Sequence, residues 1–299
     1  MTTARAPLST RNPQAYGFVV TVLGVLFFFP DVLVVRLIQA DTMTIAVWRG
    51  VAAFVATALA LGLFGRETLP NWWELLRWPS LAMIFLQGVG SVFFLASLGQ
   101  TSAANALLIL ATAPFIAAMM SWAVLRERID AATWGAIVGV FGGVGIIAAG
   151  SLGGGHLSGD LFALANAVVI AAYYVVIRMA PSGNLMPSIA LGYLLTSLIA
   201  LPFAPMEVLS LPQYGLIAIS GGVILAGGCF LLQIGPRYLP AAEVSMITML
   251  EVIAGPLLVW LFIGENPGLK TLIGGSVILA VITGHTLVKL AQSQRGQPA

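Results

Sequence analysis

The chain has 299 residues, of which 59% are hydrophobic and only 8% charged, and its mean hydropathy is +1.00. This composition excludes an ordinary soluble globular domain. The formal net charge is +2, but the basic residues are scattered along the chain rather than clustered on one face, which argues against a nucleic-acid partner.

Long uncharged runs divide the chain into about ten segments. Between Pro79 and Leu125 there is no Asp, Glu, Lys or Arg. A hydrocarbon core about 30 Å thick needs roughly 20 helical residues, and apolar runs cut at charges, Pro/Gly pairs and Trp clusters have that length. The predicted spans are 14–37, 43–64, 79–98, 101–122, 131–150, 159–178, 187–206, 213–234, 240–263 and 269–290. We therefore expect an all-α polytopic membrane protein that is embedded in the lipid bilayer.

The first span contains FFFPDVLVVRL, in which a carboxylate follows a proline inside an apolar run. Pro30 removes a backbone hydrogen bond, which predicts a helix kink. Asp31 and Arg49 each lie about six residues below the predicted outer ends of spans one and two, roughly 9 Å deep at 1.5 Å per residue. They can pair across the hairpin. This pair is either a tie between two helices or a gate and substrate contact, and the two roles are compatible.

Four further side chains within the spans are candidates for substrate contact. Glu251 lies close to the predicted midplane, where a carboxylate can bind a cationic group, carry a proton or bridge helices. Gln87 and Tyr173 are neutral polar groups that can contact substrate or join helices by hydrogen bonds. Phe93 can line an apolar pocket, although an aromatic side chain at such a position more often makes ordinary packing contacts.

Small residues recur in the fifth predicted span. Gly135, Gly139 and Gly143 form GxxxGxxxG, a spacing that lets two helix backbones approach closely, either within the fold or in a homodimer. The following stretch GGGHLSGD, at 153–160, is typical of a flexible outer loop.

The basic residues orient the predicted spans. If the N-terminus is cytoplasmic, ten of the thirteen Lys and Arg residues are cytoplasmic too; Arg36 and Lys270 lie outside, and Arg49 lies within a helix. Because positive charge is retained inside during insertion, we expect both termini in the cytoplasm.

The two halves of the chain are similar in sequence, which indicates an internal repeat. Residues 98–128 can be laid on 236–265, and the pair Asp31 and Arg36 then corresponds to Tyr173 and Arg178 in the second half. A five-helix unit that repeats after an odd number of crossings is inserted upside down. We expect two inverted five-helix units, at 14–150 and 159–290.

These residues resemble a known family. The block ALLILATAP…LRER, its second copy ending in WLFIGE, the basic Arg49 and the GxxxGxxxG run are similar to the drug/metabolite transporter superfamily, with two tandem EamA-type domains over essentially the full length. The resemblance implies a ten-helix exporter of amino acids or other small metabolites, of the YddG type. FFPD stands where a Trp-Gly-Ser/Asn type of stretch is common, so the substrate is left open.

The leading hypothesis is a secondary transporter in a bacterial-type inner (plasma) membrane that exports small molecules, amino acids in particular. Efflux of hydrophobic or quaternary cations is the main alternative, because intramembrane acids outnumber bases. An enzyme or a channel is less favoured, since the only two histidines, His156 and His285, form no HExxH motif and no filter sequence is present. No cofactor is expected, and proton coupling or uncoupled facilitated diffusion are both open.

Overall fold

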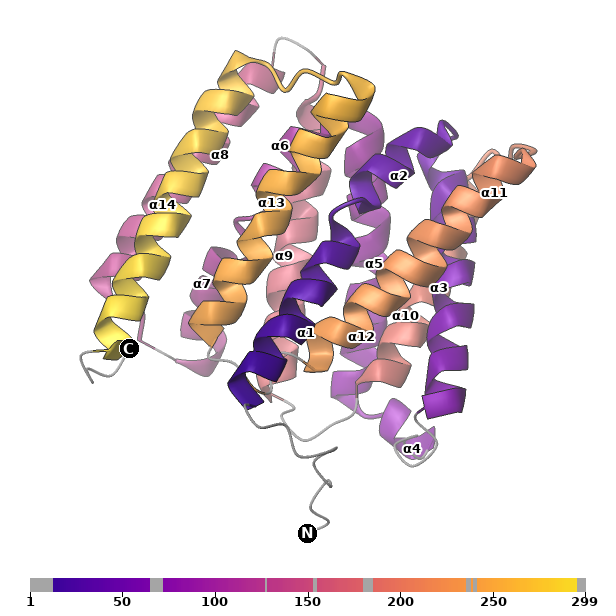
Figure 1. Ribbon diagram of the computed structural model, residues 1–299, viewed down its shortest axis with the longest axis horizontal. Coiled ribbons are helices and arrows are strands. Elements are labelled where there is room, and N and C mark those ends of the chain that lie inside the picture. Colours follow the sequence, from indigo (N-terminus) through magenta and orange to yellow (C-terminus); the bar gives the residue numbers. More distant parts are fainter. Residues whose placement is uncertain are drawn as a thin grey trace.

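The computed structural model describes residues 13–64, 72–126, 128–152, 155–179, 185–234, 238 and 241–294. Throughout these residues the regular elements are helices, which pack into one bundle (Figure 1). The expected all-α fold class is thereby confirmed. In chain order the helices are α1 (Pro13–Phe28), α2 (Asp31–Ile38), α3 (Thr42–Phe64), α4 (Trp72–Leu75), α5 (Trp78–Gln100), α6 (Ala103–Leu110), α7 (Ala113–Leu125), α8 (Ala131–Ser151), α9 (Leu157–Met179), α10 (Met186–Ala200), η1 (Leu201–Phe203), α11 (Leu211–Ile217), η2 (Ala218–Leu225), α12 (Ala226–Ile234), α13 (Ala241–Ile263) and α14 (Leu269–Gln294).

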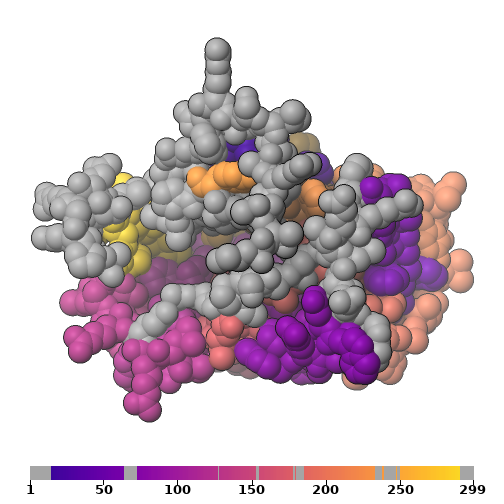
Figure 2. All heavy atoms as spheres, turned by 90° about the horizontal axis from the view of Figure 1, so that it is seen from below, coloured from indigo at the N-terminus to yellow at the C-terminus, as the bar shows by residue number. Residues whose placement is uncertain are grey.

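Most of these helices have the length and hydropathy of membrane spans. In the described part of the chain nine segments meet both criteria, and the apolar stretch Leu250–Ile263 of α13 is a shorter one. The first described residue of α1 and the last of α14 lie at the same end of the bundle (Figure 1). Figure 2 views that end, where α3 and α14 lie on opposite sides. The protein is therefore a multi-pass membrane protein.

The two halves of the chain pack in an exchanged pattern. The first helix of the first half, α1, packs against α12 and α13, and the first helix of the second half, α9, packs in the same way against α5 and α7. The pairs α3 with α10, and α8 with α14, join equivalent helices of the two halves. The helices α1 and α9 also run in opposite directions (Figure 1).

Several of the long helices are interrupted. The first predicted span is divided into α1 and α2 by Phe29 and Pro30, as the missing N–H of proline leads one to expect. The fourth is divided into α6 and α7 just before Pro114, whereas Pro256 lies inside the continuous α13. The eighth contains η2, which is a π-helix. Such wide turns occur frequently at functional sites.

The glycines of α8 differ in what surrounds them. A Cβ added at Gly139 would lie 2.7 Å from Val281, and one at Gly143 would lie 2.6 Å from Ile278, so both face α14 at close range. Among the described residues, a Cβ added at Gly135 would meet no atom within 4 Å. Gly139 and Gly143 thus serve packing inside the fold, and Gly135 does not.

Candidate functional site

A buried ion pair joins α2 to α3. Arg49 donates from Nη2 to Oδ2 of Asp31 at 2.5 Å, and the side chains are only 3% and 6% exposed. Ser220 of η2 donates from its hydroxyl to Oδ1 of Asp31 at 2.9 Å. The pairing expected across the hairpin is present, and η2 adds a third element to it. Both oxygens of this buried carboxylate therefore have a donor.

The guanidinium of Arg49 is only partly satisfied. The ring of Phe94 lies under it, with 5.8 Å between Cζ and the ring centroid. Nε is buried, and within the described part of the chain it has no hydrogen-bond partner. A buried donor without a partner costs free energy, so this atom is a place where a ligand oxygen would be stabilised.

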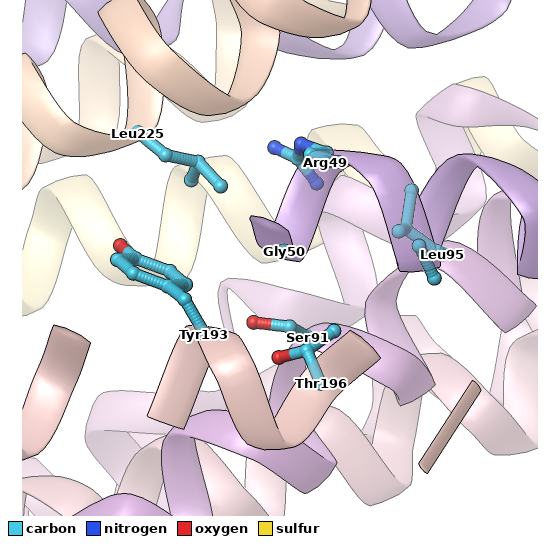
Figure 3. Close-up of a pocket in the computed structure, with 8 residues that line it drawn as sticks. Arg49, Gly50, Ser91, Leu95, Tyr193, Thr196 and Leu225 are labelled. Carbon is cyan, nitrogen blue, oxygen red and sulfur yellow. The ribbon is translucent and has the colours of Figure 1, made fainter. Parts of the chain in front are cut away.

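Arg49 also lines a small pocket between α3, α5 and α10. The pocket encloses about 10 Å³, room for about one water molecule. In Figure 3 the hydroxyls of Ser91 and Thr196 point toward the space bounded by Arg49 and the ring of Tyr193. The lining residues are Ala46, Arg49, Gly50, Ser91, Leu95, Tyr193, Thr196 and Leu225. A substrate larger than water can enter only after the helices around the pocket move.

Two glycines allow the neighbouring helices to approach Arg49. A Cβ added at Gly50 would lie 2.3 Å from Oγ of Ser197 and 2.6 Å from the carbonyl oxygen of Tyr193, both on α10. A Cβ added at Gly221 would lie 2.5 Å from the carbonyl oxygen of Arg49. Because no Cβ atom tolerates such distances, glycine at these two positions is what brings α10 and η2 against α3.

Of the remaining predicted residues, Gln87 lies beside the pocket. Its Nε2 donates to the hydroxyl of Ser91 at 3.2 Å. Phe93 instead packs on Phe162 of α9, with 5.9 Å between ring centroids. Its neighbour Phe94 is the ring that reaches Arg49.

Tyr173 lies on α9 and Glu251 lies on α13. Tyr173 packs with Cys229 against the hydrophobic cluster that contains Tyr193, and Cys229 lies 3.0 Å from the Tyr193 hydroxyl. Glu251 is partly buried and close enough to Asp31 for the two carboxylates to interact electrostatically. The structure thus gathers five of the six predicted contact residues around one region, and Phe93 lies apart on the α9 side of its helix.

A family of known proteins matches the sequence in both halves of the chain. The model of the EamA-like transporter family matches residues 16–149 and matches again at 157–286. The chain belongs to the EamA-like transporter family. The family resemblance inferred from the sequence motifs is confirmed, including its occurrence as two tandem copies. The protein is accordingly a membrane protein of a family of small-molecule transporters.

Other comparisons add the fold alone. A solved structure titled only "Crystal structure of protein" is similar to this EamA-like transporter over 95% of this chain and 99% of its own, with a TM-score of 0.63 and 17% identity. The search of curated proteins found no match.

A second buried polar cluster in this EamA-like transporter is centred on Asp160. The carboxylate accepts hydrogen bonds from the Thr101 hydroxyl at 2.6 Å, the Asn105 amide at 3.1 Å and the Ser151 hydroxyl at 2.5 Å. Thr271 donates to Oδ1 of Asn105 at 2.6 Å. Sequence reasoning placed this aspartate at the end of a flexible loop. The predicted loop is wrong from Leu157 onward, because α9 begins there, whereas the predicted span 159–178 already includes Asp160, which is 4% exposed.

An ion pair lies on the same side of the bundle. Arg36 of α2 contacts Glu265 at 3.1 Å between Nε and Oε2, and Oε1 of Glu265 accepts a hydrogen bond from the backbone N–H of Ala103 at 2.6 Å. Arg36 also donates to the carbonyl oxygen of Thr101 at 2.8 Å. These bonds tie α2 of the first half to the loop before α14 of the second.

Proposed function

We propose that this EamA-like transporter is a secondary transporter that exports small metabolites, amino acids in particular, across a bacterial-type inner membrane by alternating access. The observation that carries the proposal is the buried pair of Asp31 and Arg49 beside a small polar pocket. A zwitterion offers an ammonium for the carboxylate and a carboxylate for the guanidinium. Because a zwitterion brings a counter-charge for each member of the pair, binding would leave neither buried charge stranded.

The same proposal includes ten spans in two inverted five-helix units, with both termini in the cytoplasm. The exchanged packing of the halves and the opposite directions of α1 and α9 support the inverted arrangement. The distribution of Lys and Arg supports the orientation. Accessibility of single cysteines introduced after Gln294 and in the loop at Gly155 to a membrane-impermeant reagent tests it; labelling of Gly155→Cys alone in intact cells is expected.

A second candidate is efflux of hydrophobic cations. It is favoured by Glu251, since this carboxylate lies within electrostatic reach of Asp31 and adds a second acidic group to the region. The two functions are separated by counterflow in proteoliposomes, with labelled amino acids in one series and a quaternary ammonium dye in the other. Exchange of amino acids supports the proposal, and exchange of the dye alone overturns it.

Coupling has its own test. If export is coupled to protons, Glu251 is the residue we propose as the carrier, because it is a partly buried carboxylate within a span and lies within electrostatic reach of Asp31. Glu251→Gln is then expected to abolish the pH dependence of exchange while counterflow at fixed pH persists. An unchanged pH dependence in this variant would rule out Glu251 as the carrier.

A further inference from the structure

The pocket beside Arg49 contains two hydrogen-bond donors with spare capacity. The first is Nε of Arg49, which is buried and has no partner in the described residues while Nη2 is held by Asp31. The second is the hydroxyl of Ser91. Its oxygen accepts a bond from Gln87 at 3.2 Å, and none of the bonds described here uses its proton. Both residues line the same pocket.

The other hydroxyls of the pocket are already engaged. Thr196 donates to the carbonyl oxygens of Gly192, at 3.1 Å, and Gly88, at 3.3 Å, so it has no proton left for a ligand. The Tyr193 hydroxyl lies 3.0 Å from Sγ of Cys229. Leu95 and Leu225 close the pocket with apolar surface. The spare donors are therefore confined to the Arg49 and Ser91 side.

We propose that Arg49 Nε and the Ser91 hydroxyl form a carboxylate subsite, and that Ser91 is a specificity-determining residue. Two donors, one of them cationic, match the two oxygens of a carboxylate. A carboxamide at the same place would turn its NH₂ group toward a donor and lose one bond. The pocket has room for about one water molecule, so the carboxylate end of the substrate enters it only when the surrounding helices move apart, and the remainder of the substrate stays outside.

In this subsite, different nitrogen atoms of Arg49 contact Asp31 and the substrate. Asp31 is held by Arg49 and Ser220 on its two oxygens. A carboxylate bound at Nε leaves the bond from Nη2 to Asp31 in place. The guanidinium then serves a structural partner and a substrate at once, so binding begins without breaking the ion pair. This inference rests on the proposed export of zwitterions.

The test is competition in counterflow. The amino acid that exchanges best in proteoliposomes is used as the labelled probe, with the same amino acid and its carboxamide as unlabelled competitors. Ser91→Ala should raise the half-inhibitory concentration of the free acid by roughly tenfold, the loss expected for a hydrogen bond to a charged group, and leave that of the carboxamide unchanged. Ser91→Thr, which keeps the hydroxyl, should restore the preference.

Ser97→Ala is the matched control, because Ser97 lies on the same helix and its hydroxyl donates to the carbonyl oxygen of Phe94 outside the pocket. It should leave both competitors unchanged. If amino acids exchange but Ser91→Ala shifts acid and carboxamide equally, or neither, the subsite is overturned and the proposed function stands. If no amino acid exchanges in the wild type, the proposed function itself falls.

Discussion

Asp31 and Asp160 are both 4% exposed, yet their surroundings differ. Asp160 accepts hydrogen bonds from three neutral side chains, those of Thr101, Asn105 and Ser151. Asp31 accepts one bond from a neutral hydroxyl and one from the guanidinium of Arg49, which lines a pocket and whose Nε has no partner among the described residues. One carboxylate belongs to a complete network, and the other to an incomplete one.

This difference indicates a structural role for the Asp160 cluster and a binding role for the Asp31 region. A buried polar network whose members are all satisfied has nothing to gain from a ligand, and it fixes the helices that contribute to it. A buried charge pair with a spare donor gains from a ligand that completes it. The Asp160 cluster therefore joins α5, α6, α8, α9 and α14, whereas the Asp31 region is where substrate is expected.

The largest effect is expected from breaking the charge pair on one side only. Asp31→Leu leaves the guanidinium of Arg49 buried without its carboxylate, which should cost about 3–5 kcal/mol of stability. The double variant Asp31→Leu with Arg49→Leu should recover most of that stability but show no amino-acid counterflow. Thermal unfolding in detergent and counterflow are the measurements. Wild-type counterflow by the double variant would leave the pair a purely structural role.

The next effect concerns the close contacts that hold the pocket. Gly50→Ala places a Cβ against Ser197 and the Tyr193 carbonyl, so α3 and α10 must separate, at a cost of about 2 kcal/mol. Counterflow should fall as well, since both helices line the pocket. Gly135→Ala, on α8, is the control, because among the described residues an added Cβ there meets no atom within 4 Å. Equal loss of stability in both variants would contradict the steric explanation.

A smaller effect is expected at the complete network. Asp160→Asn keeps the shape of the side chain but turns an NH₂ group toward donors, which should cost about 1–2 kcal/mol. The protein that remains folded should bind substrate as the wild type does. Thermal unfolding and the half-saturation concentration in counterflow separate the two properties. A raised half-saturation concentration without loss of stability would place Asp160 in the binding site.

The smallest effect is expected at a solvent-exposed ion pair. Asp130, which precedes α8, is 39% exposed and pairs with Lys289. The bond from Lys289, followed by that from the Thr133 N–H, lowers the pKa of Asp130 to about 2. Because the folded pKa lies below the unfolded value of about 3.9, the stability gained is fully present above about pH 4 and is lost as the pH falls toward 2.

For an exposed pair that stability is less than about 1 kcal/mol. Lys289→Met should lower the unfolding midpoint slightly at pH 7 and leave it unchanged near pH 2. Lys270→Met is the control, because Lys270 donates to the carbonyl oxygen of Ala149 rather than to a carboxylate. A loss that persists unchanged at the lower pH would show that Lys289 acts through packing instead of charge.

The pairing of Asp31 with Arg49 could be predicted because the number of residues between each side chain and the outer end of its helix gives its depth in the membrane, and the two depths are equal. The break at Pro30 follows from the missing N–H in the same way. The predicted span 159–178 includes Asp160, but its burial in a polar cluster was not predicted, because the glycines and the histidine before it have the composition of a loop. Asn105, a polar residue inside an apolar span, was the one sign of that cluster.

The sequence does not distinguish Phe94 from Phe93 and gives no sign of Ser220, for a different reason. Adjacent residues on a helix point about 100° apart. An error of one residue in the predicted orientation of the helix therefore directs Phe93, rather than Phe94, toward Arg49. Small apolar and hydroxyl residues around Ser220 give no sign of a π-helix. Which neighbouring helix a side chain faces depends on how the helices pack against each other. The sequence of a single span does not contain that information.

The π-helix also alters the helix that follows it. Because its hydrogen bonds close over five residues rather than four, η2 accommodates an extra residue, and everything after it is turned by about 100° relative to an unbroken α-helix. Cys229, four residues beyond the end of η2, reaches Tyr193 in this rotated register. Tightening η2 into an α-helix without removing a residue would therefore turn α12 by about 100° and change which side of it faces lipid, whereas deleting one residue from η2 would leave α12 facing as it does now.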